Sequence, residues 1–295
     1  MYFPIAGIEV SPVVPPLTAF VVSFFTSMGG ISGAFLLLPF QMSVLGYTNP
    51  SVSATNQFYN VVAIPAGVYR YIKEKRMVWP LTAAVAAGTL PGVFIGAYAR
   101  VAWLPDPRQF KLFVAVVLIY IGLRLVRDLL KKNAAKPTAS AAQPFEVRVL
   151  EFSLQRISYT FQGETHSCPT LGILLLSFVV GIVGGAYGIG GGAIIAPFFV
   201  AWFRLPVHTI SGATLMGTFL TSVAGVFFYM LIAPFFPQQS VSPDWALGLL
   251  FGIGGMAGMY CGARCQKHVP ATAIKWLLGV IIVGTALKYA AESLL

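Results

Sequence analysis

Charged residues are scarce in this chain of 295 residues: Asp, Glu, Lys and Arg make up 9% of it, against 57% hydrophobic residues. A chain with so little charge could not keep its surface in water, which excludes the soluble classes. Several apolar runs are long enough to cross a bilayer core of roughly 30 Å. We therefore expect an all-α polytopic protein of the cell membrane (plasma or inner membrane), surrounded by the lipid bilayer. The first apolar stretch lacks a basic leader, so no removable signal peptide is expected.

Acidic residues are missing from the apolar runs. Cation transporters and proton relays usually keep a carboxylate in mid-membrane, so this absence argues against a cationic substrate. The net charge of +10 could suggest nucleic acid, but the basic residues cluster at the ends of the runs, where topology signals lie. We expect no nucleic-acid partner. The nine acids at the margins or outside the runs are Glu9, Glu74, Asp106, Asp128, Glu146, Glu151, Glu164, Asp244 and Glu292.

Cysteine and histidine are also few, with three residues of each. Three cysteines cannot form a disulfide framework. Cys261 and Cys265 share a helical face, but a zinc site needs a second pair of ligands, which the sequence does not offer. The sequence therefore predicts no metal and no cofactor.

Glycine, in contrast, is concentrated in two places that resemble each other. The stretch MGGISGAFLLLP at residues 28–39 interrupts an apolar run, and GIGGGAIIAP at residues 188–197 repeats its pattern. The register then holds without a gap, with Ser53 over Ser211 and Tyr71 over Tyr229. The chain is therefore duplicated. The predicted units are a first membrane repeat, a cytoplasmic connector and a second membrane repeat, at residues 1–127, 128–168 and 169–295.

The breaks decide the topology. As one helix, residues 17–47 would be about 46 Å long, too long for a single crossing. Folded at its glycines, each broken segment becomes a re-entrant hairpin, which leaves three transmembrane helices per repeat and makes the two repeats inverted. With the basic loop at residues 70–76 cytoplasmic, this arrangement places more Lys and Arg inside than eight plain crossings do. Both arrangements leave three basic residues on the side away from the cytoplasm, against the positive-inside bias: Arg100, Arg108 and Lys111.

The connector contains two kinds of sequence. Residues 133–144 have the small residues and prolines of a linker. Apolar and polar residues then alternate through residues 145–161, which predicts a small strand pair on the cytoplasmic side. We interpret it as a structural appendage or a contact in a homodimer, with a regulatory domain as the alternative.

The glycine breaks themselves predict a binding site. An apolar helix restarts after each break, and its free N–H groups and partial positive charge favour an anion near the midplane. Neutral hydrogen-bonding residues follow each break at helical spacing and would line the substrate path. The alternative is that the glycines allow close helix packing and the polar groups join helices. The expected substrate-binding residues are Gly29, Gly30, Ser32, Gly33, Asn56, Gln57, Asn60, Gly188, Gly190, Gly191, Gly192, Thr214 and Thr218.

These paired motifs resemble those of the TauE/SafE family of sulfite and organosulfur anion exporters. The resemblance covers nearly the whole chain and rests on residues 29–39, 184–197, 53–56 and 211–214. It implies a membrane transporter of small sulfur-containing anions such as sulfite, sulfoacetate or other sulfonates, mostly outward, and no enzyme. The first motif departs from the second, with Ser32 opposite Gly190 and Ala34 opposite Gly192. This difference leaves the balance of the two half-sites open.

Two other functions fit parts of the sequence. An anion channel of the same architecture cannot be told from a carrier by sequence. An intramembrane serine protease could use Ser32 as nucleophile, but it needs a histidine base within reach. His166 and His268 lie in loops, and His208 begins a span. Because the second break has Gly190 in place of Ser32, the repeat disfavours the protease.

Overall fold

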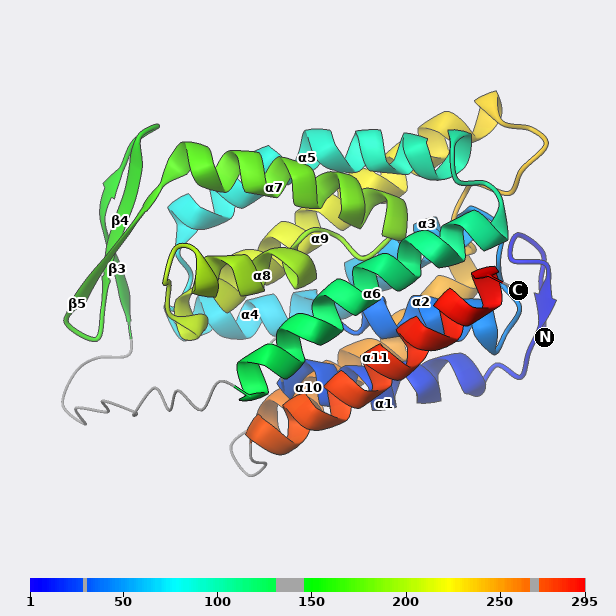
Figure 1. Ribbon diagram of the computed structural model, residues 1–295, viewed down its shortest axis with the longest axis horizontal. Coiled ribbons are helices and arrows are strands. Elements are labelled where there is room, and N and C mark those ends of the chain that lie inside the picture. The colour runs from blue at the N-terminus through cyan, green and yellow to red at the C-terminus, as the bar shows by residue number, and fades with distance from the viewer. Residues whose placement is uncertain (29–30, 131–145, 266–270, 295) are drawn as a thin grey trace.

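The computed structural model describes residues 1–28, 31–130, 146–265 and 271–294. Most of the chain is helical. Within the described residues, four helices are long and apolar enough to cross a membrane. They cover Trp79–Ala102, Thr170–Tyr187, Thr209–Phe235 and Trp245–Gly262. The long axis of the molecule follows these helices (Figure 1), and this agrees with the predicted all-α polytopic membrane protein.

Each glycine-rich segment folds into a helical hairpin. The first joins α1 (Val14–Met28) to α2 (Ala34–Ser43), and the second joins α7 (Thr170–Tyr187) to α8 (Gly192–Ala201). The first hairpin opens toward the end of the molecule where both chain termini lie, and the second opens toward the opposite end (Figure 1). The two repeats are therefore inverted, as the sequence predicted.

The helices that follow each hairpin run back and forth along the bundle. Proline explains one difference between the repeats: Pro65 separates two helices in the first, whereas one continuous helix occupies this place in the second. The apolar run that follows the first hairpin is thus divided into two helices. The first repeat has α3 (Ser51–Ala63), α4 (Pro65–Lys73), α5 (Trp79–Ala102) and α6 (Pro107–Leu130). The second has α9 (Val207–Ile232), the 3₁₀ turn η1 (Ala233–Phe235), α10 (Trp245–Cys265) and α11 (Ala271–Leu294).

The repeats are interlocked through glycine. Helix α5 of the first repeat packs along α7 of the second, and α10 of the second packs along α1 of the first. A Cβ at Gly92 would lie 2.3 Å from the Phe178 carbonyl oxygen, and one at Gly258 would lie 2.3 Å from the Phe20 oxygen. Only glycine permits such approach. Both contacts belong to rows of glycines four residues apart, namely Gly88, Gly92 and Gly96, and Gly254, Gly258 and Gly262.

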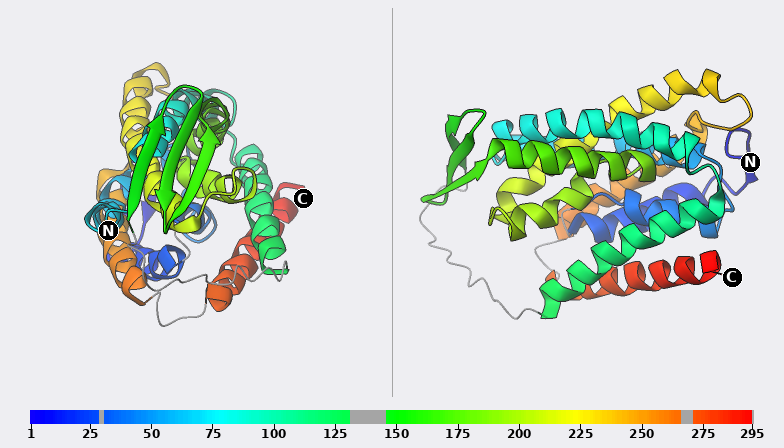
Figure 2. Two further views of the ribbon diagram at one scale, coloured as in Figure 1. Left: turned by 90° about the vertical axis from the view of Figure 1, so that its left-hand side faces the viewer. Right: turned by 45° about the horizontal axis from the view of Figure 1, so that its top comes forward.

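The third helix pair, α6 and α11, lies side by side on one flank of the bundle (Figure 2). Gly122 of α6 approaches this partner closely, since a Cβ there would lie 2.8 Å from a methyl group of Val283. The pair joins the last helix of one repeat to the last helix of the other.

A sheet of three antiparallel strands stands at the end of the bundle opposite the termini (Figure 1). Its strands are β3 (Val147–Phe152), β4 (Arg156–Phe161) and β5 (Glu164–Pro169), and β4 lies in the middle. The first two strands fall where residue alternation predicted a pair. The third was not predicted, because its mostly polar residues show no alternation. A separate pair, β1 (Tyr2–Phe3) and β2 (Ile8–Glu9), lies near the N-terminus.

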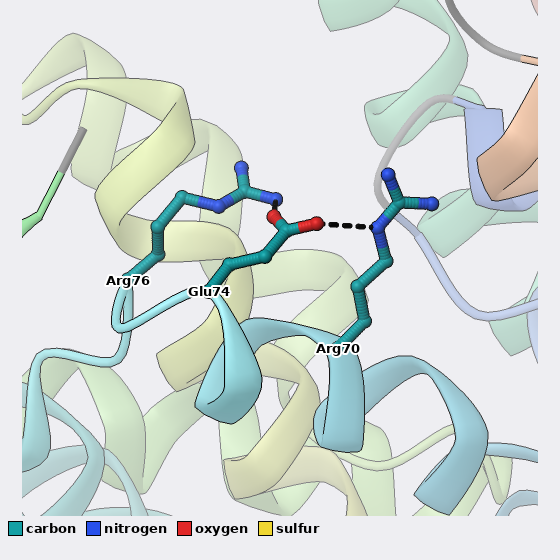
Figure 3. A network of polar contacts seen from close by, with 3 residues as sticks. All are labelled: Arg70, Glu74 and Arg76. Atoms are coloured by element: carbon teal, nitrogen blue, oxygen red, sulfur yellow. Dashed lines mark hydrogen bonds and ion pairs between the residues drawn. The ribbon is translucent and has the colours of Figure 1, made fainter.

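The sheet is attached to both repeats. The Tyr159 hydroxyl lies 2.7 Å from the Thr209 Oγ1 at the start of α9, and the Val147 N–H donates to the Lys75 carbonyl. Beside Lys75, the Glu74 carboxylate accepts hydrogen bonds from Arg70 and Arg76 (Figure 3). Partial burial raises the pKa of Glu74, but these two arginines outweigh it and hold the pKa below its ordinary value. Glu74 thus links two arginines of the basic loop at residues 70–76.

Candidate functional site

The two glycine breaks meet in the interior of the bundle at Asn56. Its amide nitrogen donates to the Ala34 carbonyl at 2.9 Å, at the start of α2, and to the Gly188 carbonyl at 3.0 Å, in the second break. Asn56 is fully buried on α3. One side chain therefore links the first residue of one half-helix to the break that precedes the other.

A serine caps the beginning of α2. The Ala34 N–H donates to the Ser32 Oγ at 3.3 Å, and this hydroxyl donates in turn to the Asn60 Oδ1 at 2.6 Å. The Asn60 amide nitrogen then donates to the Ile189 carbonyl at 3.2 Å and to the Ser222 Oγ at 3.2 Å. A helix leaves its first N–H groups without intrahelical partners, and here a buried side chain supplies one.

A threonine does the same at the beginning of α8. The Gly192 N–H donates to the Thr218 Oγ1 at 2.9 Å, and this hydroxyl donates to the Thr214 carbonyl at 2.9 Å. In the sequence repeat, Ala34 corresponds to Gly192 and Asn60 corresponds to Thr218. The two half-helices are thus capped from equivalent positions, through Ser32 in the first repeat and directly in the second.

The second break requires its glycines. Gly188 and Gly190 have φ angles of +82° and +66°, in the left-handed region that side chains with a Cβ rarely adopt. A Cβ at Gly188 would also lie 2.4 Å from the Ser53 carbonyl oxygen, and one at Gly192 would lie 2.1 Å from the Thr218 Oγ1. Close approach and left-handed backbone together explain why glycine recurs in this segment.

Two buried glutamines complete the polar cluster. The Gln57 amide nitrogen donates to the Gly185 carbonyl at 3.4 Å, and that of Gln41 donates to the Asn56 Oδ1 at 3.3 Å. The Oε1 atoms of both are buried without a hydrogen-bond partner among the described residues. Sequence reasoning missed Gln41, although a glutamine inside the otherwise apolar segment AFLLLPFQMS was a signal that could have found it.

The site is rich in donors and contains no described acid. Among the described residues, Asp244 is the single buried carboxylate, and it accepts hydrogen bonds from the Ala6 and Leu247 N–H groups rather than from the cluster. The described part of the chain holds no group of three or more His, Cys, Asp or Glu that could bind a metal. Among the described residues the cluster is therefore neutral, and its hydrogen bonds join the two breaks.

Most of the predicted site residues converge here. Gly33 lies beside the Tyr59 hydroxyl, Gly191 beside Thr89, and the Thr214 hydroxyl donates to Ser211 at 3.1 Å within its own helix. Gly29 and Gly30 lie outside the described residues. Ser32 bonds to Asn60 and Ala34 rather than to a described histidine, since His166 lies in the sheet. The described contacts give Ser32 a capping role; substrate binding by the cluster stays a prediction.

Comparison with known proteins identifies the family. The model of the sulfite exporter TauE/SafE family matches residues 16–289. The chain belongs to this family. The match spans both hairpins and the connector, and the family confirms the resemblance seen in the glycine motifs. A member with four described membrane-length helices is a multi-pass membrane protein.

The curated relatives carry transporter names. The chain is 23% identical over 264 residues to the probable membrane transporter protein YunE of Bacillus subtilis, covering 87% of this chain and 89% of the relative. It is 24% identical to a probable membrane transporter protein of Xylella fastidiosa, covering 90% of each chain. It is 26% identical to the sulfite exporter TauE/SafE family protein 6 of Arabidopsis thaliana, over 48% of this chain and 33% of the relative. No solved structure matches the chain significantly.

Proposed function

We propose that the protein exports small sulfur-containing anions, such as sulfite, sulfoacetate or other sulfonates, and binds them between the N-termini of α2 and α8. One observation carries the proposal: two half-helices from opposite directions begin in the interior, and Asn56 links the start of α2 to the break that precedes α8. The family name, which refers to sulfite export, supports the substrate class. In this proposal the protein is a transporter rather than an enzyme.

Electrostatics favours an anion of modest affinity. Each helix N-terminus contributes about 0.3–2 kcal/mol to a nearby negative charge. Two such ends bind weakly enough for the anion to leave again, which a transporter needs. The absence of a described carboxylate from the cluster removes the main source of repulsion.

The side-chain donors of the site are engaged in hydrogen bonds within the protein. Asn56 and Asn60 donate to the carbonyls of Gly188 and Ile189, which belong to the second break. An anion between the breaks would compete for these donors and release the second break from α3. We infer that binding and movement are linked in this way, with one repeat shifting against the other to give alternating access.

Flux in proteoliposomes tests the proposal. Purified parent protein should catalyse saturable uptake of radiolabelled sulfite, while Asn56→Ala and Gly191→Leu should each lower the rate at least about tenfold, since each removes or blocks a donor group. Gly284→Leu is the matched control, because a Cβ at Gly284 on α11 meets no atom within 4 Å. If folded Asn56→Ala and Gly191→Leu proteins move sulfite at the parental rate, the site lies elsewhere.

A channel of the same architecture remains the second candidate. Counter-substrate inside the vesicles should stimulate uptake by a carrier, whereas a channel should give unitary currents in planar bilayers. Inside-out and right-side-out vesicles then measure the preferred direction. A thermal-shift comparison of sulfite, sulfate, sulfoacetate and taurine identifies the preferred anion, because a ligand that binds the native state stabilises it.

A further inference from the structure

Arg100 is a buried cation at the end of α5 that lies away from the sheet. Its side chain has no exposed surface, and it is the single buried Lys or Arg among the residues whose burial is described. Burying an isolated charge is costly unless other groups compensate it. The groups that compensate the charge of Arg100 therefore bear on its function.

The described partners of Arg100 compensate its charge only in part. One terminal nitrogen donates to the Leu104 carbonyl and the other to the Thr48 carbonyl at 3.3 Å, and the guanidinium lies 3.7 Å from the centre of the Phe110 ring. The Nε is buried without a hydrogen-bond partner. These partners are neutral, and no described acid forms an ion pair with Arg100.

A second positive element lies at the same place. Thr48, which accepts from Arg100, lies three residues before Ser51, where α3 begins inside the protein. A helix carries partial positive charge at its N-terminus. The guanidinium and this helix end therefore favour a negative charge in one small region.

Buried hydroxyl groups connect this region to the glycine breaks. Tyr47 directly precedes Thr48, whose carbonyl accepts from Arg100, and Tyr229 packs in one cluster with Ala97 and Val101 of α5. The Tyr229 hydroxyl donates to the Gly185 carbonyl at 3.0 Å, just before the second break, and the Tyr47 hydroxyl lies 2.7 Å from the Thr55 Oγ1. Thr55 precedes Asn56 on α3, so polar groups follow one another from Arg100 to the candidate site.

Burial also explains an anomaly in the sequence. Arg100 lies on the wrong side of the membrane in either arrangement of the spans, if it is counted as a loop residue. The positive-inside bias concerns loops near the membrane ends, and a buried guanidinium is not part of that count. The buried Asp244 belongs to the same group of residues, since its N–H donates to the Thr55 Oγ1 at 2.8 Å, but it forms no described ion pair with Arg100. A buried cation without an ion pair is the arrangement expected where an anion passes.

We propose that Arg100 is a second anion-binding residue, which holds the transported sulfur anion on its way between the glycine breaks and the end of the molecule where the chain termini lie. This inference rests on the proposed function. The guanidinium presents donors in a planar fork that matches two oxygens of a sulfite or sulfonate group. In the present conformation the carbonyls of Thr48 and Leu104 occupy those donors, and opening of this end of the bundle exchanges them for the anion.

Two variants and a control test the inference in proteoliposomes. Arg100→Gln keeps hydrogen-bond donors for the two carbonyls but removes the charge, and it should raise the KM for sulfite at least about tenfold. Arg100→Lys keeps the charge and should fall between this variant and the parent. Arg108→Gln, at an exposed residue of the same end, should match the parent. A folded Arg100→Gln protein with the parental KM would overturn the inference.

Chemical labelling decides the matter if Arg100→Gln does not fold. Phenylglyoxal, a neutral reagent for arginine, is added to the parent protein, and modification of the Arg100 and Arg108 peptides is followed by mass spectrometry. Sulfoacetate is the anion used, because sulfite itself adds to the aldehyde of phenylglyoxal and would slow labelling of every arginine. Sulfoacetate should slow labelling of Arg100 severalfold and leave Arg108 unchanged. Absence of labelling at Arg100, or labelling that sulfoacetate does not slow, overturns the inference. A parent that transports sulfite without these effects retains the proposed function; a parent that neither binds nor transports any tested anion refutes both.

Discussion

The two breaks solve the same local problem with different residues. Each must provide a partner for the first N–H group of a half-helix inside the protein. In the first repeat, Asn60 reaches the helix end through Ser32, and the first residue can be Ala34. In the second, the shorter Thr218 contacts the helix end directly, and a Cβ on Gly192 would clash with it. The two hairpins are symmetric, but Thr218 lies so close to the start of α8 that only glycine fits at residue 192. Asn60 acts through Ser32 and leaves room for alanine at residue 34.

A further difference lies in where the helix after each break sends its side-chain hydrogen bonds. Asn56 and Asn60 of α3 donate to carbonyls of the opposite repeat, whereas the equivalent Thr214 and Thr218 of α9 donate to carbonyls of their own helix. The first repeat therefore supplies long donors, and the second supplies the tight, left-handed backbone. A duplicated membrane protein can thus share its function unequally between halves while both halves keep one fold.

The largest expected effect comes from the backbone of the second break. Gly188→Ala should unfold the break, because it adds left-handed strain of about 1–2 kcal/mol to overpacking of about 1–3 kcal/mol against Ser53. Gly46 separates the two causes, since it has φ +72° and a Cβ there meets no atom within 4 Å. Gly46→Ala should show the strain alone. Free energies of unfolding in mixed micelles measure both, and equal losses would contradict the role of the close contact.

The next prediction tests the symmetry. Gly92→Ala and Gly258→Ala place a Cβ equally close to a carbonyl of the partner helix, 2.3 Å in each case. Each should cost about 1–3 kcal/mol of stability through overpacking, and the two losses should agree within about 0.5 kcal/mol. Thermal unfolding in the same detergent measures both. A loss confined to one variant would show that α5–α7 and α10–α1 are not equivalent contacts.

The sequence allowed the architecture to be predicted, because duplication is visible in residue identities. Gly30 to Tyr71 align with Gly188 to Tyr229 without a gap, and helix length then required hairpins and inversion. The glycine rows on α5 and α10 were a readable signal as well, since their four-residue spacing is present in both repeats. The break at Pro65 has no equivalent in the second repeat, and alignment alone could not show it.

The contacts of the site were harder to predict. Sequence indicated that Asn56 and Asn60 share a face of a helix, and the structure brings them to the breaks. It could not indicate that their amides bond to Gly188 and Ile189, because that depends on how one repeat is positioned against the other. Arg100 was misplaced for the same reason. The positive-inside bias is counted from the sequence, whereas the burial of Arg100 depends on how the helices pack.

The unequal roles of α3 and α9 predict unequal losses at equivalent positions. Asn56→Ala leaves two buried carbonyls without this donor and should cost about 1–3 kcal/mol. Thr214→Val, at the matching position, removes a bond to a carbonyl of the same helix and should cost less than about 1 kcal/mol. Chemical denaturation of both variants measures the difference. Similar losses would mean that the two halves support the breaks equally.

The smallest effect concerns the sheet between the two repeats. Burial raises the pKa of the Cys168 thiol on β5 to about 11, and the thiolate is the reactive form. In a Cys261→Ser, Cys265→Ser background, maleimide should therefore label Cys168 slowly at pH 7, and the rate should rise about tenfold per pH unit toward pH 9. The control places cysteine on the exposed neighbour, as Ser167→Cys with Cys168→Ser, and its rate should level off near pH 8.5. If Cys168 follows the profile of this control, its thiol is not buried and the sheet is not packed as described.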